Sequence, residues 1–238
     1  MTRIQVVLNL ILPSGVSVLD RILNGGLHTG FFTHVYGDAA SGKTTLALQF
    51  VKNAHRLNLG TIYVNSENTS PIERLEQMTA QPFSEIQGMV KILAPKGFNE
   101  QGALIDDLEL YLREDTKLVI IDTLTRYYRL ELEDKKTNYE RHRELNRQAG
   151  VLKGLARNHK VAVLVLNQVR AQIKGMDDFE PVAKNILDYW SDYTIKLRVA
   201  RGPGERIIKR IIPEGEFSDG RLYLIKSGLS PDKPHEKE

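Results

Sequence analysis

The sequence of 238 residues contains no cysteine, one tryptophan and no apolar run long enough to cross a membrane. The absence of cysteine excludes disulfides and thiolate-bound metal. The six histidines are scattered without the close pairing that a zinc site needs, so no structural zinc is expected. An apolar stretch at residues 6–12 lacks the basic lead and the cleavage site of a signal peptide. We therefore expect a cytoplasmic protein without a membrane partner.

Positive and negative charge nearly cancel, since 33 Lys and Arg residues face 30 Asp and Glu residues and leave a formal net charge of +3. This charge is too small to indicate a nucleic-acid partner, so any site for a polyanion must be local. The hydrophobic content of 41% suffices for one core, and no Pro-, Gly- or Ser-rich stretch divides the chain. We predict a single domain over residues 1–229, with its core from about residue 13, and a polar, frayed tail over residues 230–238.

The sequence does contain a phosphate-binding loop pattern. Residues 37–44 fit G-x-x-x-x-G-K-[ST] and lie between an apolar run at residues 31–36 and a helix-forming stretch. In this pattern, backbone N–H groups cradle phosphate oxygens, the lysine reaches the β- and γ-phosphates, and the threonine hydroxyl ligates Mg²⁺. The sequence therefore predicts that ATP and Mg²⁺ bind at Gly37, Asp38, Ala39, Ala40, Ser41, Gly42, Lys43, Thr44 and Thr45.

Short apolar runs continue along the chain, at residues 61–64, 89–93, 118–121 and 161–166. Helix-like stretches lie between them, at residues 72–78, 103–112 and 139–156. This alternation is typical of a mostly parallel sheet with helices on both faces. Three strand-like runs with short connections follow, at residues 193–199, 206–212 and 221–225. Because short connections require antiparallel pairing, we predict an α/β fold whose sheet ends in an antiparallel meander.

Two carboxylates follow strand-like runs. Lys117–Asp122 is an apolar strand that ends in Asp122, the Walker B pattern, in which Asp122 would hold Mg²⁺ through a water. Asp122 can also simply end a core strand. Glu67, after the run at residues 61–64, is our candidate for the group that orients and deprotonates an attacking water. Alternatively, Glu67 caps the helix at residues 72–78, since acidic residues favour helix starts.

These motifs form an ordered series. Residues 19–30, Leu-Asp-Arg-Ile-Leu-Asn-Gly-Gly-Leu-His-Thr-Gly, resemble the entry to the ATPase core of RecA-type recombinases, specifically the archaeal RadA branch. Tyr63–Glu67 is similar to that family's Y-I-D-T-E, Leu166–Val169 to its T-N-Q-V sensor, and Pro213–Glu216 to its P-E-G-E. The resemblance covers approximately residues 13–229 and implies a RecA-like P-loop ATPase core.

The resemblance is to the core alone. A RadA chain would begin with a small helical DNA-binding domain and a linker that holds a Phe-x-x-Ala polymerisation motif, whereas this sequence starts at the ATPase core. It thus resembles a short RadA paralogue described as a recombination accessory protein. On this ground we expect strand exchange to be weak or absent.

The resemblance also implies roles where the residues match. Glu67 would be the water-activating carboxylate, and Gln168 would sense the γ-phosphate and couple it to the DNA loops, with Lys43 as the third catalytic residue. Arg74 would stack on adenine, which suits a planar guanidinium. Pro213 would cap the nucleotide of a neighbouring protomer in a homo-oligomer. Gln168 can instead be a polar strand end, and Pro213 an ordinary turn proline.

The resemblance places DNA-binding loops after the Walker B strand and after the sensor strand. Here residues 126–147 and 170–184 mix basic and acidic side chains. We expect single- or double-stranded DNA to be bound through its phosphates, independently of sequence. The candidate contacts are Arg129, Lys135, Lys136, Arg170 and Lys174.

Two departures weaken the inference to full strand exchange. The family's acidic residue two before the glutamate is Asn65 here, and its glycine pair in the second loop is Ala183-Lys184, which restricts the backbone. We predict an ATP-binding, weakly hydrolysing accessory protein of DNA repair and recombination that binds DNA and repair proteins. The alternatives are a KaiC-like signalling ATPase and a non-catalytic nucleotide-gated adaptor. KaiC-like proteins often place two adjacent glutamates at the catalytic position, whereas Glu67 has no acidic neighbour.

Overall fold

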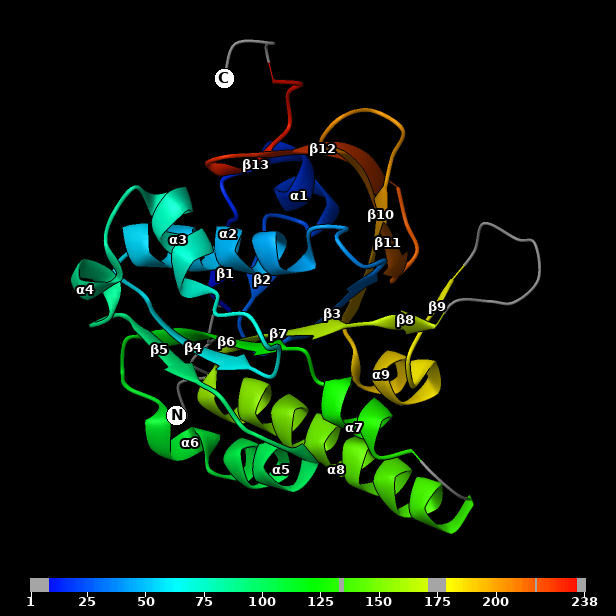
Figure 1. The fold of residues 1–238 in the computed structure, drawn as a ribbon. Coiled ribbons are helices and arrows are strands. Elements are labelled where there is room, and N and C mark those ends of the chain that lie inside the picture. The colour runs from blue at the N-terminus through cyan, green and yellow to red at the C-terminus, as the bar shows by residue number, and fades with distance from the viewer. Residues whose placement is uncertain (1–8, 133–134, 171–178, 217, 235–238) are drawn as a thin grey trace, which may run out of the picture.

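The computed structural model describes residues 9–132, 135–170, 179–216 and 218–234. Within these ranges, a nine-stranded sheet crosses the molecule and has helices on both faces (Figure 1). The strand order is β13-β12-β11-β10-β3-β7-β6-β4-β5. The predicted tail reaches beyond this part of the chain, since residues 235–238 lie outside the described residues.

The sheet has a parallel part and an antiparallel part, as the sequence predicts. The parallel strands are β3 (Phe32–Gly37), β4 (Gly60–Asn65), β5 (Val90–Leu93), β6 (Thr116–Asp122), β7 (Ala162–Asn167) and β10 (Tyr193–Val199). From β10 the sheet continues antiparallel through β11 (Glu205–Ile212), β12 (Asp219–Ile225) and β13 (Gly228–Ser230). Two short pairs stand apart, β1 (Ile11–Leu12) with β2 (Leu27–His28), and β8 (Val169–Arg170) with β9 (Glu180–Pro181).

The helices form two layers (Figure 1). One layer consists of α1 (Ser17–Ile22), α2 (Lys43–Arg56), α3 (Ile72–Thr79) and α4 (Phe83–Ile86). The other consists of α5 (Phe98–Asp106), α6 (Leu108–Tyr111), α7 (Arg126–Leu130), α8 (Lys135–His159) and α9 (Lys184–Trp190). None of the helices in the described ranges combines the length and the apolar composition that crossing a bilayer requires.

Strand β6 shows why continuous apolar runs appear in the sequence. Leu118 and Ile120 pack into the core beneath α2, while Val119 and Ile121 pack into the core against α8. Because both faces of the strand are buried, every position from 118 to 121 must be apolar. Strands β3, β4 and β7 are likewise buried on both faces. Because these strands are parallel to β6 and to one another, their carboxyl ends lie at one edge of the sheet, where polar residues follow.

Two segments differ from the sequence-based prediction. The single helix expected at residues 103–112 is divided into α5 and α6, and α5 starts earlier because Phe98 is fully buried beside Tyr128. The loop expected at residues 126–147 is mostly helical, since α7 and the first half of α8 occupy it. Many of the charged residues that suggest a loop therefore belong to helices.

A titratable residue is buried at the centre of β3. The Asn167 amide donates to Nε2 of the fully buried His34 at 3.3 Å, so the proton of the neutral ring lies on Nδ1. Nδ1 has no hydrogen-bond partner within the described residues, and the nearest carboxylate, Asp188 of α9, is 3.9 Å away. Burial lowers the pKa of His34 to about 3.

We expect His34 to make the fold sensitive to acid. Its pKa is near 6.5 in the unfolded chain, so the unfolded state binds one more proton than the folded state as pH falls from about 6.5 towards about 3. The contribution of His34 to the free energy of unfolding is therefore fully present above this window. It falls by about 2 kcal/mol between about pH 6.5 and about pH 4.5. The variant His34→Gln keeps an acceptor for Asn167. Urea unfolding at several pH values should show that its free energy of unfolding falls less steeply with decreasing pH than that of the wild type. Identical pH slopes in the two proteins would contradict the assignment.

Candidate nucleotide-binding site

The predicted phosphate-binding loop connects β3 to α2 at the carboxyl edge of the sheet (Figure 1). Gly37 has no room for a side chain, because an added Cβ would lie 2.1 Å from the carbonyl oxygen of Leu197 on β10. Ala40 and Gly42 have φ angles of 58° and 99°, the left-handed conformation that sharp loop turns require. The loop ends at the N-terminus of α2, where unpaired amides and the helix dipole favour an anion.

The Lys43 side chain folds back over the loop. Its ammonium donates to the carbonyl oxygens of Gly37 at 2.8 Å and Asp38 at 2.7 Å. Burial lowers the pKa of Lys43, while the negative charges of Asp122, Asp38 and Glu67 act in the opposite direction. A cation is thus held at the mouth of the loop, where it can reach phosphate oxygens.

Asp122 ends β6 with its carboxylate directed at the first turn of α2. Its Oδ2 accepts hydrogen bonds from the Thr44 hydroxyl at 2.9 Å and from the Tyr63 hydroxyl at 2.5 Å. Burial raises the pKa of Asp122, and the two hydrogen bonds oppose that shift. Burial and the Asp122 charge raise the pKa of Tyr63, so its hydroxyl stays a donor. The arrangement fixes one carboxylate oxygen beside the Thr44 hydroxyl.

Glu67 lies across the cavity from the loop, just beyond the end of β4. Its Oε1 accepts hydrogen bonds from Thr123 Oγ1 at 3.2 Å and from Gln168 Nε2 at 3.0 Å. The Arg129 guanidinium in turn donates to Gln168 Oε1. A continuous chain of hydrogen bonds therefore joins Glu67, two residues beyond β4, to Gln168, the residue after β7, and to helix α7.

These groups line one cavity of about 450 Å³. Its lining residues are Gly37, Ala39, Ala40, Lys43, Thr44, Glu67, Thr69, Asp122, Thr123, Arg129, Gln168 and Val169. The structure thus brings together the candidate catalytic residues, the candidate metal ligands and most of the phosphate-binding loop. The Asp122–Thr123 peptide bond within this cavity is cis.

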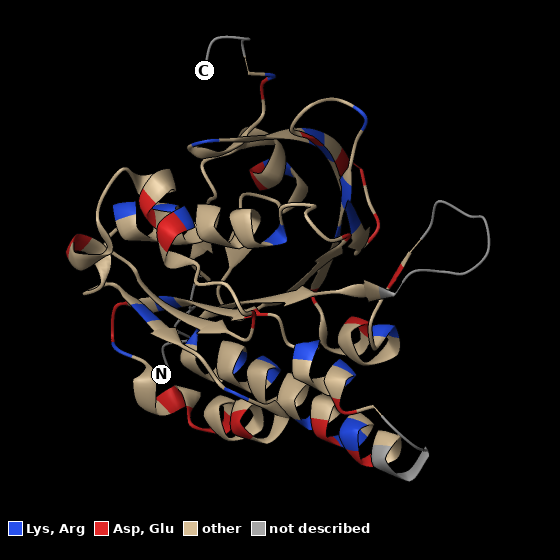
Figure 2. Cartoon of the chain, in the orientation of Figure 1, with Lys and Arg blue, Asp and Glu red and all other residues tan. Residues whose placement is uncertain are grey.

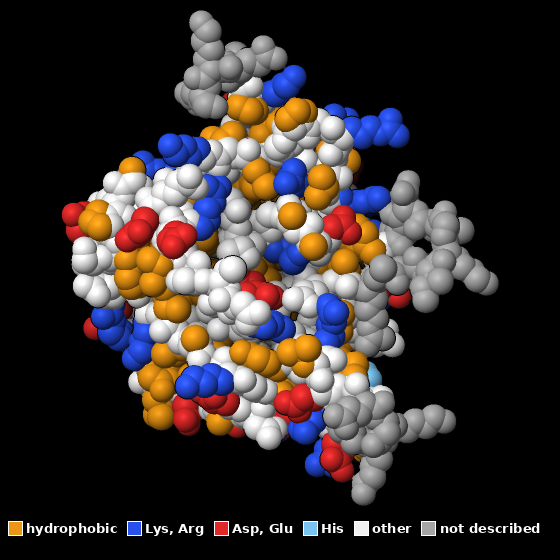
Figure 3. Space-filling model, in the orientation of Figure 1, with side chains coloured by type: hydrophobic (Ala, Val, Ile, Leu, Met, Phe, Trp, Pro, Cys, Tyr) orange, Lys and Arg blue, Asp and Glu red, His pale blue; other side chains and the backbone are white. Residues whose placement is uncertain are grey.

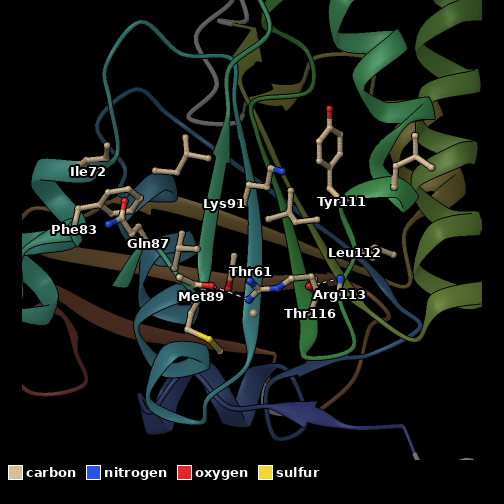
Figure 4. A pocket seen from close by; sticks show the side chains of 16 residues that line it. Thr61, Ile72, Phe83, Gln87, Met89, Lys91, Tyr111, Leu112, Arg113 and Thr116 are labelled. Carbon is tan, nitrogen blue, oxygen red and sulfur yellow. Dashed lines mark hydrogen bonds between the residues drawn. The ribbon is translucent and has the colours of Figure 1, made fainter. Parts of the chain in front are cut away.

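A second, larger cavity of about 710 Å³ lies along the outer strands β4 and β5, and Figure 4 shows the side chains around it. Phe83, Met89 and Tyr111 supply apolar surface there, and Lys91 and Arg113 add positive charge. None of the candidate site residues lines this cavity. Cavity size alone therefore does not identify the nucleotide-binding site. We assign this candidate site to the smaller cavity because the phosphate-binding loop, Lys43 and the carboxylates of Glu67 and Asp122 converge there.

Two residues predicted to contact a nucleotide, Arg74 and Pro213, do not line the loop cavity. The half-buried Arg74 of α3 donates to the carbonyl oxygens of Ile225 at 2.8 Å and Lys226 at 2.9 Å, and also to Gln77. Burial lowers the pKa of Arg74. Pro213 is exposed at the end of β11. Neither lines the 450 Å³ cavity, so their roles towards a nucleotide stay predictions.

The candidate DNA contacts come from several segments that follow β6 and β7. Arg129 lies on α7, Lys135 and Lys136 begin α8, Arg170 ends β8, and Lys174 lies outside the described residues. Basic and acidic residues are interspersed along α8 (Figure 2). The face seen in Figure 3 likewise mixes basic, acidic and hydrophobic side chains. Among the described residues on that face, basic side chains form no broad continuous surface.

Sequence reasoning missed the roles of three residues in this site. Tyr63 and Thr123 hold the two carboxylates, and Arg206 of β11 donates to the carbonyl oxygens of Ala40 and Ser41 in the loop. Tyr63 and Thr123 could have been found from their positions next to the motif strands. No feature of the sequence around Arg206 indicates its role, because its contact with the loop depends on how β11 is placed in the sheet.

The departure at Asn65 has a local structural role. Its side-chain amide donates to the carbonyl oxygen of Thr69 at 3.0 Å, and its Oδ1 accepts from the backbone N–H of Glu67 at 3.2 Å. An aspartate could accept the second bond but could not donate the first. Asn65 therefore closes the turn that presents Glu67.

A mostly parallel sheet with a phosphate-binding loop after β3 and acidic residues at the ends of β4 and β6 defines a RecA-like α/β protein. The family model Rad51 matches residues 3–227. A DNA repair and recombination protein RadB of Methanococcoides burtonii is 32% identical, over 86% of this chain and 91% of that protein. RadB proteins of Methanobrevibacter smithii and Methanothermobacter thermautotrophicus are 29% and 30% identical, each over 90% of this chain and 93% of its own length. The chain therefore belongs to the Rad51 family and, within it, to the archaeal RadB group. The resemblance to a short RadA paralogue is thereby confirmed.

Proposed function

We propose that this protein is an ATP-binding, slowly hydrolysing accessory factor of DNA repair and recombination, whose nucleotide state changes its affinity for DNA. The observation that carries the proposal is the hydrogen-bonded chain from Glu67 through Gln168 to Arg129. It connects the nucleotide cavity to the helix that follows β6, where the sequence predicts DNA contacts. The RadB relatives are named DNA repair and recombination proteins, which supports the biological role.

The loop and the N-terminus of α2 would hold the phosphates, with Lys43 contributing its charge. The Thr44 hydroxyl and the Asp122 carboxylate supply the oxygen donors that Mg²⁺ prefers, and their 2.9 Å contact places both at one point of the cavity. Thr44 would ligate the ion directly and Asp122 through a water. Bound Mg²⁺ would neutralise negative charge on the phosphates.

The adenine would lie outside the 450 Å³ cavity. Arg74, held by two carbonyl oxygens next to the β12–β13 turn, would offer the face of its guanidinium to the base. Pro213 would cap the nucleotide of a neighbouring copy if the protein forms a homo-oligomer.

Hydrolysis would depend on Glu67. Its carboxylate is held by Thr123 and Gln168 on the side of the cavity opposite the loop, which suits a base that removes a proton from water. A γ-phosphate that attracts the Gln168 amide would compete with Glu67 for the same donor.

That competition supplies the switch. A shift of Gln168 towards the phosphate alters its bond with Arg129, and so changes the position of a cation available to DNA. Lys135, Lys136, Arg170 and Lys174 would contribute further phosphate contacts, which do not depend on base sequence. Recombination or repair proteins are the further partners that we propose.

The test is a DNA titration at fixed salt with ATP, with ADP and without nucleotide, followed by an ATP titration with and without DNA. Thermodynamic linkage requires that DNA and ATP change each other's affinity by the same factor. We expect a reciprocal factor of about 5 or more. Equal DNA affinity in all three nucleotide states would overturn the switch, and absence of ATP hydrolysis would favour the non-catalytic adaptor. Robust strand exchange by the protein alone would overturn the accessory role.

A further inference from the structure

The phosphate-binding loop rests on the C-terminal part of the sheet. Gly37 packs against the backbone of Leu197 on β10, and a Cβ at Gly42 would lie 3.0 Å from the Leu224 side chain on β12. Between these two contacts, the side chain of Arg206 reaches the loop from β11. The C-terminal strands β10, β11 and β12 therefore support the phosphate-binding loop from the side.

Arg206 places each of its three nitrogens on a backbone carbonyl. Its Nε donates to Ser41 O at 2.9 Å and one terminal nitrogen donates to Ala40 O at 3.0 Å. The other terminal nitrogen donates to Glu205 O on its own strand at 2.8 Å. The rigid guanidinium fork therefore ties two successive peptide units of the loop to β11.

These two peptide units lie directly before the N-terminus of α2. In a trans peptide unit the C=O and N–H groups point in opposite directions, so fixing the carbonyls of Ala40 and Ser41 also fixes the N–H groups of Ser41 and Gly42. The first N–H closes a turn to Asp38 O at 3.2 Å. The second belongs to the residue before α2, at the end of the helix where an anion is favoured.

The loop also needs support because of its backbone conformation. Ala40 has a φ of 58°, which is disfavoured for a residue with a Cβ and persists only where surrounding contacts hold it. The hydrogen bond from Arg206 to Ala40 O is such a contact. In addition, a cation at the carbonyl end of a peptide unit polarises that unit and strengthens its N–H as a donor to phosphate.

We propose that Arg206 is a positioning residue of the nucleotide site, which holds the phosphate-binding loop ready for the phosphates before a nucleotide arrives. The inference rests on the ATP binding proposed above. It assigns to the meander a role in nucleotide affinity, in addition to its role in the fold. Arg206 acts through the loop backbone, so its effect falls on phosphates that ATP and ADP share.

The experiment compares three variants with the wild type: Arg206→Gln, Arg206→Lys and, as a control, Arg221→Gln. Arg221 lies on the neighbouring strand, is 70% exposed and pairs with Glu205 at 2.6 Å without touching the loop. Affinities are measured with fluorescent ATP and ADP analogues, at a temperature where circular dichroism shows every protein folded. Steady-state hydrolysis then gives KM and kcat separately.

Arg206→Gln should weaken both nucleotides by about tenfold, because two charge-assisted hydrogen bonds to the loop are lost. The ratio of ATP to ADP affinity should stay constant, and KM should rise while kcat changes little. Arg206→Lys, which can reach one carbonyl, should lose about threefold. Arg221→Gln should bind like the wild type.

Wild-type affinity in folded Arg206→Gln would overturn the role of Arg206, and so would an equal loss in Arg221→Gln. If Arg206→Gln does not fold, wild-type affinity in Arg206→Lys decides against the proposal in the same way. Absence of ATP binding by the wild type would instead overturn the proposed function itself. The two failures are therefore distinguishable.

Discussion

Replacing Lys43 with alanine is expected to lower ATP affinity by on the order of a hundredfold or more. In the structure the Lys43 ammonium lies at the mouth of the loop, within hydrogen-bond distance of the Gly37 and Asp38 carbonyls. It lines the cavity beside the loop, and backbone dipoles alone cannot replace its charge. Removing it also leaves Asp122 and Glu67 without a compensating positive charge beside the loop.

The measurement is ATP binding by calorimetry, with thermal unfolding of the free protein as the check on folding. Lys52→Ala is a matched control, because Lys52 lies on the same helix, α2, but donates to Ser227 O and does not line the loop cavity. We expect Lys52→Ala to bind ATP like the wild type. Equal ATP affinity in Lys43→Ala and the wild type would remove the phosphate site from this loop.

The parts of the fold that the sequence predicts best are those where one physical constraint decides the residue type. Strand β6 is buried on both faces, so its apolar run can be recognised without any knowledge of its neighbours. The convergence of Glu67, Asp122 and Gln168 is also predictable. Each lies at or just beyond the carboxyl end of a parallel strand, and these ends meet at one edge of the sheet.

The parts that the sequence does not predict depend on contacts between distant segments. The earlier start of α5 follows from burial of Phe98 beside Tyr128, which are 30 positions apart. Arg206 reaches the loop across 165 positions, and Arg74 reaches Ile225 across 151. A charged residue on an amphipathic strand or helix looks the same in the sequence whether it faces water or holds a loop carbonyl.

Arg129 illustrates how such contacts change an interpretation. Basic residues after a Walker B strand suggest DNA binding, and the sequence offers no reason to separate Arg129 from Lys135 and Lys136. The structure places Arg129 on the lining of the proposed nucleotide cavity, where it donates a hydrogen bond to Gln168. Arg129, which the sequence predicts as a DNA contact, therefore also contacts the proposed nucleotide site. Coupling between DNA binding and ATP binding requires such a shared contact.

Glu67→Gln should separate binding from hydrolysis. The amide oxygen of glutamine can still accept the hydrogen bonds from Thr123 and Gln168, so the shape of the site is retained while the basic carboxylate is lost. We expect hydrolysis to fall on the order of a hundredfold or more, as for loss of a general base, and ATP affinity to stay within about threefold.

Single-turnover hydrolysis with protein in excess over ATP measures this effect even where steady-state turnover is slow. Glu73→Gln is the control, because Glu73 is exposed in the first turn of α3 and does not line the cavity. An unchanged rate in Glu67→Gln would move the catalytic role to another residue. A loss of ATP affinity equal to the loss of rate would mean that Glu67 serves binding, since a base that acts only on the attacking water leaves the affinity for the nucleotide intact.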